Sequence, residues 1–224
     1  MKKPIIIKNK ISKFSKSIKV SGDKSISIRW ALLASQAIGK SKAYNILKSE
    51  DVLSTLKCLK KLGIKIKLKN EICEIDGNGL NSYNYKKNLV LNAGNSGTLG
   101  RLILGLLINS PKKIKLIGDK SLSKRDFSRV IKPLQLFGVK IKSRQKRLPI
   151  EIIGNDFLRP IKYNENIGSA QVKSCIILAA LNTPGNTILN SKHSRNHTEL
   201  MLKFLKYPIK IQKKKILKKF QFPD

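Results

Sequence analysis

The chain has 224 residues, 41% of them hydrophobic, and its 47 Lys and Arg against 13 Asp and Glu residues give a net charge of +34 at pH 7. This length and composition exclude a disordered chain and predict a globular protein with one or two cores. The charge favours an anionic or phosphorylated ligand, whereas lysines scattered along the whole chain and an aromatic content of 6% argue against a dedicated nucleic-acid surface.

The first expected helix begins at Gly22-Asp23-Lys24-Ser25 and runs over residues 25–38. Asp23 is a candidate N-cap, and the free N–H groups of the first turn favour an anion at this end. Ser25 and Arg29 lie four residues apart and share one helix face, with Lys24 beside them. The stretch predicts a site for a phosphate or carboxylate group. The alternative is a capped surface helix with solvated charges.

A similar helix start occurs twice more, at Gly94-Asn95-Ser96-Gly97-Thr98 and at Gly168-Ser169-Ala170-Gln171. Glycine lets the backbone approach a ligand closely, and helices expected over residues 98–108 and 171–181 follow. If the three helices stack with threefold pseudo-symmetry, their N-terminal ends point into one cleft. Their dipoles then add at one doubly anionic ligand.

After each of these helices the order of elements repeats. Short strands are expected over residues 42–47, 113–117 and 186–189, and a second helix begins near Asp51, Asp126 or Asn196. Gly63 and Gly138 are candidate C-caps of this second helix, and the alternation after them predicts strands. The third copy is imperfect, because Pro208 replaces the glycine and a lysine-rich stretch precedes a weak last strand.

The sequence therefore predicts one α/β domain of three βαβαββ repeats, about residues 21–93, 94–167 and 168–224, with the helices inside. Residues 1–20 do not fit this repeat. Within them, residues 4–7 (Pro-Ile-Ile-Ile) are expected to form a strand that belongs to a second domain.

Two arginines precede the second helices of the later repeats. Arg125 stands before Asp126 and Arg195 before Asn196, where each could clamp a carboxylate or phosphate. His193 and His197 are four residues apart and resemble half a zinc site, but no third ligand is evident, so no metal site is predicted. A capping box at Thr198 is the preferred interpretation of this loop.

Cysteine usage indicates the compartment. Cys58, Cys73 and Cys175 are odd in number and form no CxxC pair, which favours a reducing environment. No segment has the apolar length of a membrane span, and residues 1–19 lack a secretory apolar region. We therefore expect a cytoplasmic protein without a membrane partner.

Five motifs in order along residues 20–205 resemble the EPSP synthase (3-phosphoshikimate 1-carboxyvinyltransferase) family. The stretch over residues 22–29 is similar to its GDKSISHR signature, and residues 94–101 are similar to a second signature. Residues 118–125 resemble its GDxSLxxRP loop, and residues 169–174 and 195–199 resemble the SAQVKS and RDHTE motifs of its bacterial branch. The resemblance implies the enolpyruvyl transferase fold, an inside-out α/β barrel.

The resemblance also implies a reaction. The enolpyruvyl group of phosphoenolpyruvate would pass to the 5-hydroxyl of shikimate 3-phosphate through a tetrahedral intermediate, with release of phosphate and without metal or organic cofactor. Lys24 and Gln171 would be catalytic and would contact both substrates. The other residues implied for shikimate 3-phosphate are Ser25, Arg29, Ser169, Ala170 and Arg195, and those for phosphoenolpyruvate are Asn95, Gly97 and Arg125. Gly97 is the glycine of glyphosate-sensitive members, so inhibition by glyphosate is expected wherever the enzyme is active.

The chain departs from the family pattern at three motif positions and in length. Ile28 replaces the signature histidine, Asp126 the usual proline and Asn196 the aspartate of RDHTE. The chain is roughly half of the two-domain family, whose other half supplies acid–base groups. Because general acid–base groups contribute about 10²–10⁴-fold, this fragment alone is expected to be nearly inactive.

The first hypothesis is therefore the N-terminal half of an EPSP synthase, either truncated or completed by a separate C-terminal chain. A related enolpyruvyl transferase acting on a UDP-sugar, or a fold relative acting on RNA 3′-phosphate ends, is the second. A basic non-catalytic nucleic-acid-binding module is the third, and salt-dependent, sequence-independent DNA binding would favour it.

Overall fold

The computed structural model of the chain describes residues 8, 13, 15–212 and 215–218, and for residue 212 and residues 215–218 the backbone alone. Its helices are α1 (Lys24–Ala34), α2 (Glu50–Lys61), α3 (Gly97–Leu106), α4 (Lys120–Ser123), α5 (Ser128–Leu136), α6 (Ala170–Leu181) and α7 (His197–Phe204). Its strands are β1 (Ile38–Ala43), β2 (Lys65–Lys69), β3 (Ile72–Asn78), β4 (Leu89–Asn92), β5 (Ile114–Ile117), β6 (Lys140–Ser143), β7 (Ile150–Ile153), β8 (Lys162–Glu165), β9 (Ile188–Ser191), β10 (Ile209–Gln212) and β11 (Lys215–Lys218).

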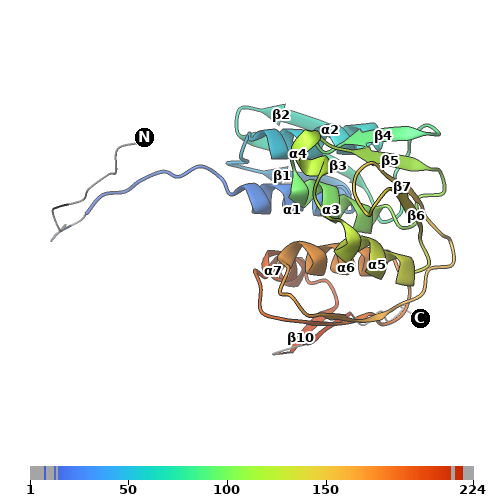
Figure 1. Ribbon diagram of the computed structural model, residues 1–224. Helices are drawn as coiled ribbons and strands as arrows, with labels where there is room; N and C mark the ends of the chain where they lie inside the picture. The colour runs from blue at the N-terminus through green and yellow to red at the C-terminus, as the bar shows by residue number, and fades with distance from the viewer. Residues whose placement is uncertain (1–7, 9–12, 14, 213–214, 219–224) are drawn as a thin grey trace.

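Three sheets surround the helices (Figure 1). The second sheet has the order β4-β5-β7-β6 and the third has the order β8-β9-β11-β10. In both, the first pair of strands is parallel and the other pairs are antiparallel. The first sheet, β1-β3-β2, has the same two antiparallel pairs. Among the described residues it lacks the first strand, the one that is parallel to its neighbour in the other two sheets. The second and third units thus have the βαβαββ order expected from the sequence.

The helices α3 and α6 form the centre of the molecule, in contact with each other. Every residue of α3 except Arg101 is buried, and so is every residue of α6 after Gln171. A helix that is apolar on all sides is stable only when it is covered on all sides. The expectation that helices lie inside and sheets outside is therefore confirmed.

The contact between these two helices depends on Gly105. A Cβ atom at this position would overlap the carbonyl oxygen of Cys175 in α6, which is backbone and cannot move aside. Gly105→Ala is therefore expected to lower the unfolding free energy by about 2 kcal/mol or more, as overpacking does in tight cores.

Gly100 in the same helix provides the matched control. A Cβ there would come no closer than 3.4 Å to any atom, at the ring of Phe127. Gly100→Ala is expected to be neutral or to stabilise the protein by up to about 1 kcal/mol, the helix-propensity gain. Urea unfolding of the two variants checks this, and equal stabilities would contradict the proposed close approach.

Two expected boundaries near the first helix are wrong. The helix ends at Ala34 instead of residue 38, and the next strand covers Ile38–Ala43 instead of residues 42–47. Ser35 ends the helix because its hydroxyl donates to the carbonyl of Leu32, which competes with helical hydrogen bonding. The expected C-cap glycines are confirmed, since Gly63 and Gly138 have φ of 87° and 105°.

The third repeat ends differently from the others. Lys206, with φ of 55°, takes the left-handed conformation that glycine has in the first two copies, and α7 is shorter than α2. The expected last strand is present as β11, between β10 and β9, while residues 213–214 of the lysine-rich stretch lie outside the described residues.

The segment before α1 runs away from the body of the molecule (Figure 1). Residues 15–20 are exposed and form no strand, and Lys19 lies 3.7 Å from Glu71. The strand expected over residues 4–7 lies outside the described residues, so the assignment of residues 1–20 to a second domain stays a prediction.

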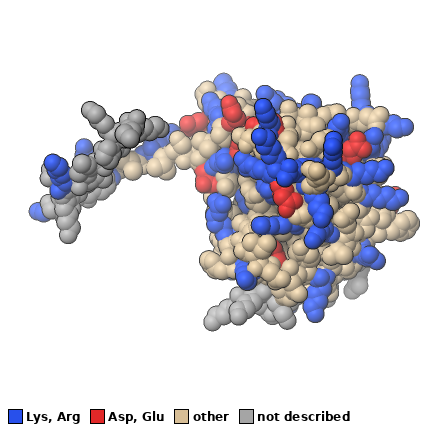
Figure 2. Space-filling view, viewed as in Figure 1, with Lys and Arg blue, Asp and Glu red and all other residues tan. Residues whose placement is uncertain are grey.

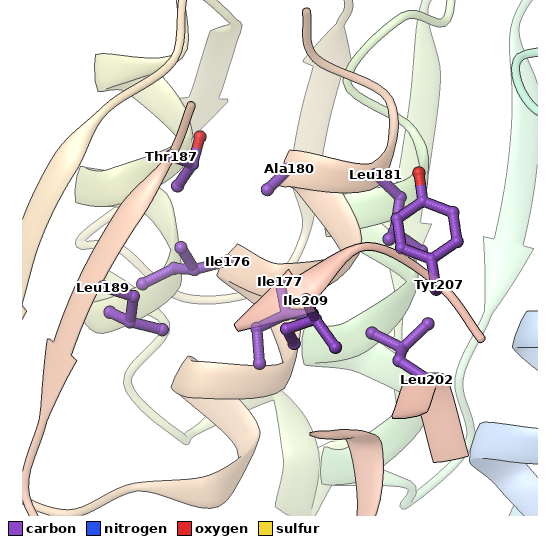
Figure 3. Close-up of a pocket in the computed structure, with 9 residues that line it drawn as sticks. All are labelled: Ile176, Ile177, Ala180, Leu181, Thr187, Leu189, Leu202, Tyr207 and Ile209. Carbon is purple, nitrogen blue, oxygen red and sulfur yellow. The ribbon is translucent and has the colours of Figure 1, made fainter. Parts of the chain in front are cut away.

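A small apolar cavity lies between α6 and the third sheet. Its volume is about 20 Å³, and side chains such as Ile177, Leu202 and Ile209 face one another across it (Figure 3). This space is about the size of one water molecule and mostly apolar, so it is a packing gap and not a substrate site. None of the helices formed by the described residues has the length and apolar character needed to cross a bilayer.

Candidate active site

Side-chain hydrogen bonds link the first turns of the three helices that have glycine-containing starts. Gln171 at the start of α6 donates from Nε2 to Thr98 Oγ1 at the start of α3, at 3.1 Å. One turn further on, Arg29 of α1 donates from Nη2 to Ser174 Oγ of α6, at 3.2 Å. Because both contacts join the first two turns of each helix, the positive ends of three helix dipoles lie together.

Each of these helices has a side-chain N-cap. Asp23 accepts from the backbone N of Ile26 at 2.7 Å, as expected from the sequence. Ser96 and Ser169 accept from the third backbone N–H of α3 and α6, at 3.2 and 3.4 Å. The buried carboxylate of Glu165 accepts further hydrogen bonds from the backbone N–H groups of residues 167–169. The backbone N–H groups just before α6 are therefore already bonded to a carboxylate of this chain, that of Glu165.

Arg29 lies in a buried polar network between α1, α6 and α7. Its side chain donates to Thr198 Oγ1 at 2.9 Å, to the carbonyl of Ser25 at 3.0 Å and to Ser174 Oγ. Burial, and then the charge of Arg195, lower its pKa. Three of its five N–H donors are engaged with neutral groups, which leaves two for a ligand.

The capping box expected at Thr198 is wrong. Thr198 is buried inside α7, where its hydroxyl bonds to Arg29 and Ser174, and Asn196 makes no side-chain cap. Beside this network, Lys173 Nζ lies 2.6 Å from Glu199 Oε1, and both side chains are about 95% buried. The loop motif thus serves to anchor α7 to α6.

A second arginine group lies at the start of α3. Arg101 donates from Nη1 to Gln171 Oε1 at 3.0 Å and from Nη2 to the carbonyl of Asp126 at 3.1 Å, and its guanidinium lies over the Phe127 ring. Burial, and then the charge of Arg125, lower the pKa of Arg101. Arg125 in turn donates to Asn95 Oδ1 at 3.1 Å.

The site therefore holds two arginine pairs of like charge, Arg29 with Arg195 and Arg101 with Arg125. Within the described part of the chain, no carboxylate lies within ion-pair distance of any of these four guanidinium groups. A ligand with several negative charges would relieve the repulsion in both pairs. The helix α6 contacts both pairs, because its Gln171 bonds to Arg101 and its Ser174, one turn further on, bonds to Arg29.

Lys24 has a different surrounding from that expected of a substrate contact. Its ammonium lies 2.9 Å from Asp51 Oδ2 at the start of α2, and its side chain is 48% exposed. To reach a ligand at the helix ends, Lys24 must leave this ion pair. Arg195 is exposed, as is Asn95, while Ser25, Ser169 and Ala170 are half-buried.

Several residues of this site were not assigned to a substrate by the sequence interpretation. Arg101 belongs to the second anion-binding helix start and could have been assigned, because it follows Gly97 by four residues as Arg29 follows Ser25. The buried residues Lys173, Ser174, Thr198 and Glu199 lie inside the motifs, but only the packing of α6 against α7 assigns them a role.

Other expected residues have structural surroundings. Ile28, in place of the signature histidine, is fully buried in the core and so contributes packing. Asp126 accepts hydrogen bonds from the backbone N and hydroxyl of Ser128 at the start of α5. The described residues contain no group of three or more His, Cys, Asp or Glu side chains that could hold a metal ion. The expectation of a metal-free site stays a prediction.

Comparison with known proteins decides the family. The sequence model of the family "EPSP synthase (3-phosphoshikimate 1-carboxyvinyltransferase)" matches residues 8–219. This chain belongs to the EPSP synthase family. It is 48% identical over 202 residues to the 3-phosphoshikimate 1-carboxyvinyltransferase of Vesicomyosocius okutanii, covering 89% of this chain and 46% of that protein.

Further relatives agree with this membership. The Streptococcus pyogenes serotype M2 protein of the same name is 45% identical over 189 residues, which are 83% of this chain and 44% of that protein. The solved EPSP synthase of Acinetobacter baumannii superposes with a TM-score of 0.84 at 36% identity, over 89% of this chain and 46% of that one. The chain therefore has the enolpyruvyl transferase fold and spans about half the length of its EPSP synthase relatives.

Proposed function

We propose that this chain carries the shikimate 3-phosphate site and part of the phosphoenolpyruvate site of an enolpyruvyl transferase. The supporting observation is that two arginine groups lie at the starts of α1, α3 and α6, where α6 contacts one group through Gln171 and the other through Ser174. Two anionic substrates match two arginine pairs, and the donors would also stabilise negative charge that develops in the transition state.

The arginine pair of Arg29 and Arg195 is assigned to the phosphate of shikimate 3-phosphate, with Ser25, Ser169 and Ala170 on the same helix ends. Arg125, Asn95 and Gly97 are assigned to phosphoenolpyruvate. Gln171 lies between the groups and orients the 5-hydroxyl toward the enolpyruvyl carbon. Lys24 leaves its ion pair with Asp51 and then contacts both substrates. In that position its side-chain amine can hold or transfer a proton.

In the proposed reaction, the 5-hydroxyl loses its proton as its oxygen bonds to C2 of phosphoenolpyruvate, and C3 takes up a proton, which gives a tetrahedral intermediate. The C–O bond to phosphate then breaks, phosphate leaves, and loss of a proton from C3 restores the double bond of the enol ether. The acid–base groups of the half outside this sequence are part of this proposal, so the chain alone is expected to bind substrate with little turnover.

A cytoplasmic location is also proposed. It is supported by three free cysteines that are buried. Burial raises the pKa of the Cys58 and Cys73 thiols to about 11 and that of the Cys175 thiol to about 12.

Lysine and arginine side chains spread over most of the face shown in Figure 2 and do not gather in one patch. This distribution does not favour a nucleic-acid surface.

Calorimetric titration tests the proposed function. We expect the chain to bind shikimate 3-phosphate more tightly than shikimate by about tenfold or more, because a phosphate adds charge-assisted hydrogen bonds of about 1.5–3 kcal/mol. Equal affinity for both ligands, or a preference for UDP-N-acetylglucosamine, would contradict it. Tighter binding to duplex DNA with strong salt dependence would favour the nucleic-acid alternative.

Gly97→Ala is expected to weaken phosphoenolpyruvate binding in the presence of shikimate 3-phosphate by about tenfold or more. The added Cβ would lie 2.9 Å from Arg101 Nη1 and 3.0 Å from Arg125 Nη1, so both guanidinium groups must move. Because these are the ends of flexible side chains, the unfolding temperature should change little. Gly100→Ala is the control on the same helix, and an unchanged affinity in Gly97→Ala would refute the assignment of Arg125.

A further inference from the structure

The helices α6 and α7, which lie beside each other, are joined by two successive pairs of buried side chains (Figure 1). In the first pair, Lys173 Nζ and Glu199 Oε1 lie 2.6 Å apart and carry opposite charges. In the second pair, Ser174 Oγ and Thr198 Oγ1 lie 2.7 Å apart, and both groups are neutral. Each of the four residues is at most 4% exposed. The two pairs are therefore similarly buried and differ in charge.

The neutral pair, called the hydroxyl pair below, holds one edge of the Arg29 guanidinium. Arg29 Nε donates to Thr198 Oγ1 at 2.9 Å, and Nη2 donates to Ser174 Oγ at 3.2 Å. Nε and Nη2 are neighbours on one side edge of the planar guanidinium. The two hydroxyl oxygens therefore lie where the two oxygens of a carboxylate lie in a bidentate ion pair. The hydroxyl pair reproduces the geometry of that carboxylate without its charge.

The charge of Arg29 is left without a bonded counter-ion. Among the residues that the structure describes, no carboxylate lies within ion-pair distance of Arg29. Glu199 and Asp23 act on its charge only from a longer distance, and the nearest partner of Glu199 is Lys173. A buried cation is costly unless a negative charge compensates it. This charge is therefore available to an anion that binds.

The donors that remain on Arg29 are defined as well. The carbonyl of Ser25, one turn back on α1, accepts one N–H of Nη1 at 3.0 Å. A guanidinium has five N–H donors, so one N–H remains on Nη1 and one on Nη2. These two atoms form the end edge of the guanidinium, opposite its stem.

We propose that Ser174 and Thr198 are positioning residues for Arg29. Their hydroxyl pair fixes the rotation of the guanidinium, and it leaves the charge and the end edge for two oxygens of an anionic ligand. Neither hydroxyl contacts that ligand. The ligand is shikimate 3-phosphate, so this part of the proposal rests on the proposed function, whereas the orientation of Arg29 does not.

Thr198→Val tests the proposal, because it removes the hydroxyl and keeps the branched shape of the side chain. In the free chain, followed by ¹⁵N NMR, we expect the Arg29 Nε–H to exchange with solvent at least about tenfold faster than in the wild type. In calorimetric titration, the affinity for shikimate 3-phosphate should fall by about tenfold. Thr198→Ser keeps a hydroxyl and should bring both values back to within about threefold of the wild type.

Thr187→Val is the matched control. Thr187 is 4% exposed and lies near Ala180 and Leu181, at the C-terminal end of α6 and away from Arg29. The same substitution there removes a buried hydroxyl that has no part in the Arg29 network. We expect it to change neither the exchange of the Arg29 Nε–H nor the affinity.

Thr198→Asp and Thr198→Asn separate charge from hydrogen bonding. Both side chains offer an oxygen to Arg29 Nε and have similar shapes, but the aspartate adds the counter-ion that the hydroxyl pair avoids. We expect Thr198→Asp to bind shikimate 3-phosphate at least about tenfold more weakly than Thr198→Asn, with an equal or higher midpoint of urea unfolding. If Thr198 had only a packing role, the affinity would follow the stability in both variants.

Three results would overturn the proposal. They are an Arg29 Nε–H that exchanges as slowly in Thr198→Val as in the wild type, equal affinities of Thr198→Val and Thr187→Val, and equal affinities of Thr198→Asp and Thr198→Asn. A wild-type chain that does not bind shikimate 3-phosphate would instead contradict the proposed function. The exchange measurement needs no ligand, so it decides the role of the hydroxyl pair in either case.

Discussion

Glu199→Gln is expected to lower the unfolding free energy by about 3–5 kcal/mol, because it leaves the ammonium of Lys173 buried without a compensating charge. The two groups lie 2.6 Å apart and are both about 95% buried, so water cannot replace the lost partner. Chemical denaturation at neutral pH measures the loss. The variant should also show a weaker contact between α6 and α7.

The double variant Lys173→Met with Glu199→Leu separates the cost of an unpaired charge from the cost of lost packing. Replacement of a buried ion pair by apolar side chains of similar volume is often neutral or stabilising. We expect this variant to recover most of the stability lost in Glu199→Gln. A double variant as unstable as the single one would show that the pair is needed for more than charge balance.

Arg29→Ala is expected to weaken shikimate 3-phosphate binding by about 10–100-fold, which corresponds to one lost charge-assisted contact of about 1.5–3 kcal/mol. The guanidinium is held by α1, α6 and α7, so its position is fixed before the ligand arrives. Calorimetric titration of the variant against the wild type measures the loss.

Because Arg29 is buried, its replacement also disturbs the network around Thr198. Arg195→Ala provides a second test, since Arg195 is exposed and its loss should reduce affinity without changing stability. Arg159→Ala is the control for loss of one positive charge. Arg159 lies in the segment before β8 and donates to the carbonyl of Leu136 at the C-terminal end of α5, so it is not part of the helix starts. Equal affinity of Arg195→Ala and Arg159→Ala would remove Arg195 from the site.

The threefold order of elements could be predicted from the sequence because each repeat carries local signals. Capping residues, glycines such as Gly63 and Gly138, and the apolar runs of α3 and α6 all act over a few residues. The boundary error at α1 has a local cause as well, since a single hydroxyl, that of Ser35, ends the helix.

The contacts of the site could be predicted only in part. The sequence gives Arg29, Arg125 and Arg195 as candidates for an anion site, and this role stays a prediction. It does not show that Arg101 lies with Arg125 or that Lys24 pairs with Asp51. These contacts join segments far apart in the chain, and they depend on how the three repeats pack. The buried pair of Lys173 and Glu199 is of the same kind, because its partners lie on different helices.

The central claim is that three helix ends form one anion site. Titration of the ¹⁵N-labelled chain with shikimate 3-phosphate tests it most directly, by following the amides of Ser25, Gly97 and Ala170 and the Nε groups of Arg29 and Arg195. We predict that signals from all three helix starts shift together with one dissociation constant. Shifts confined to a single helix start, or separate constants for each, would contradict the account.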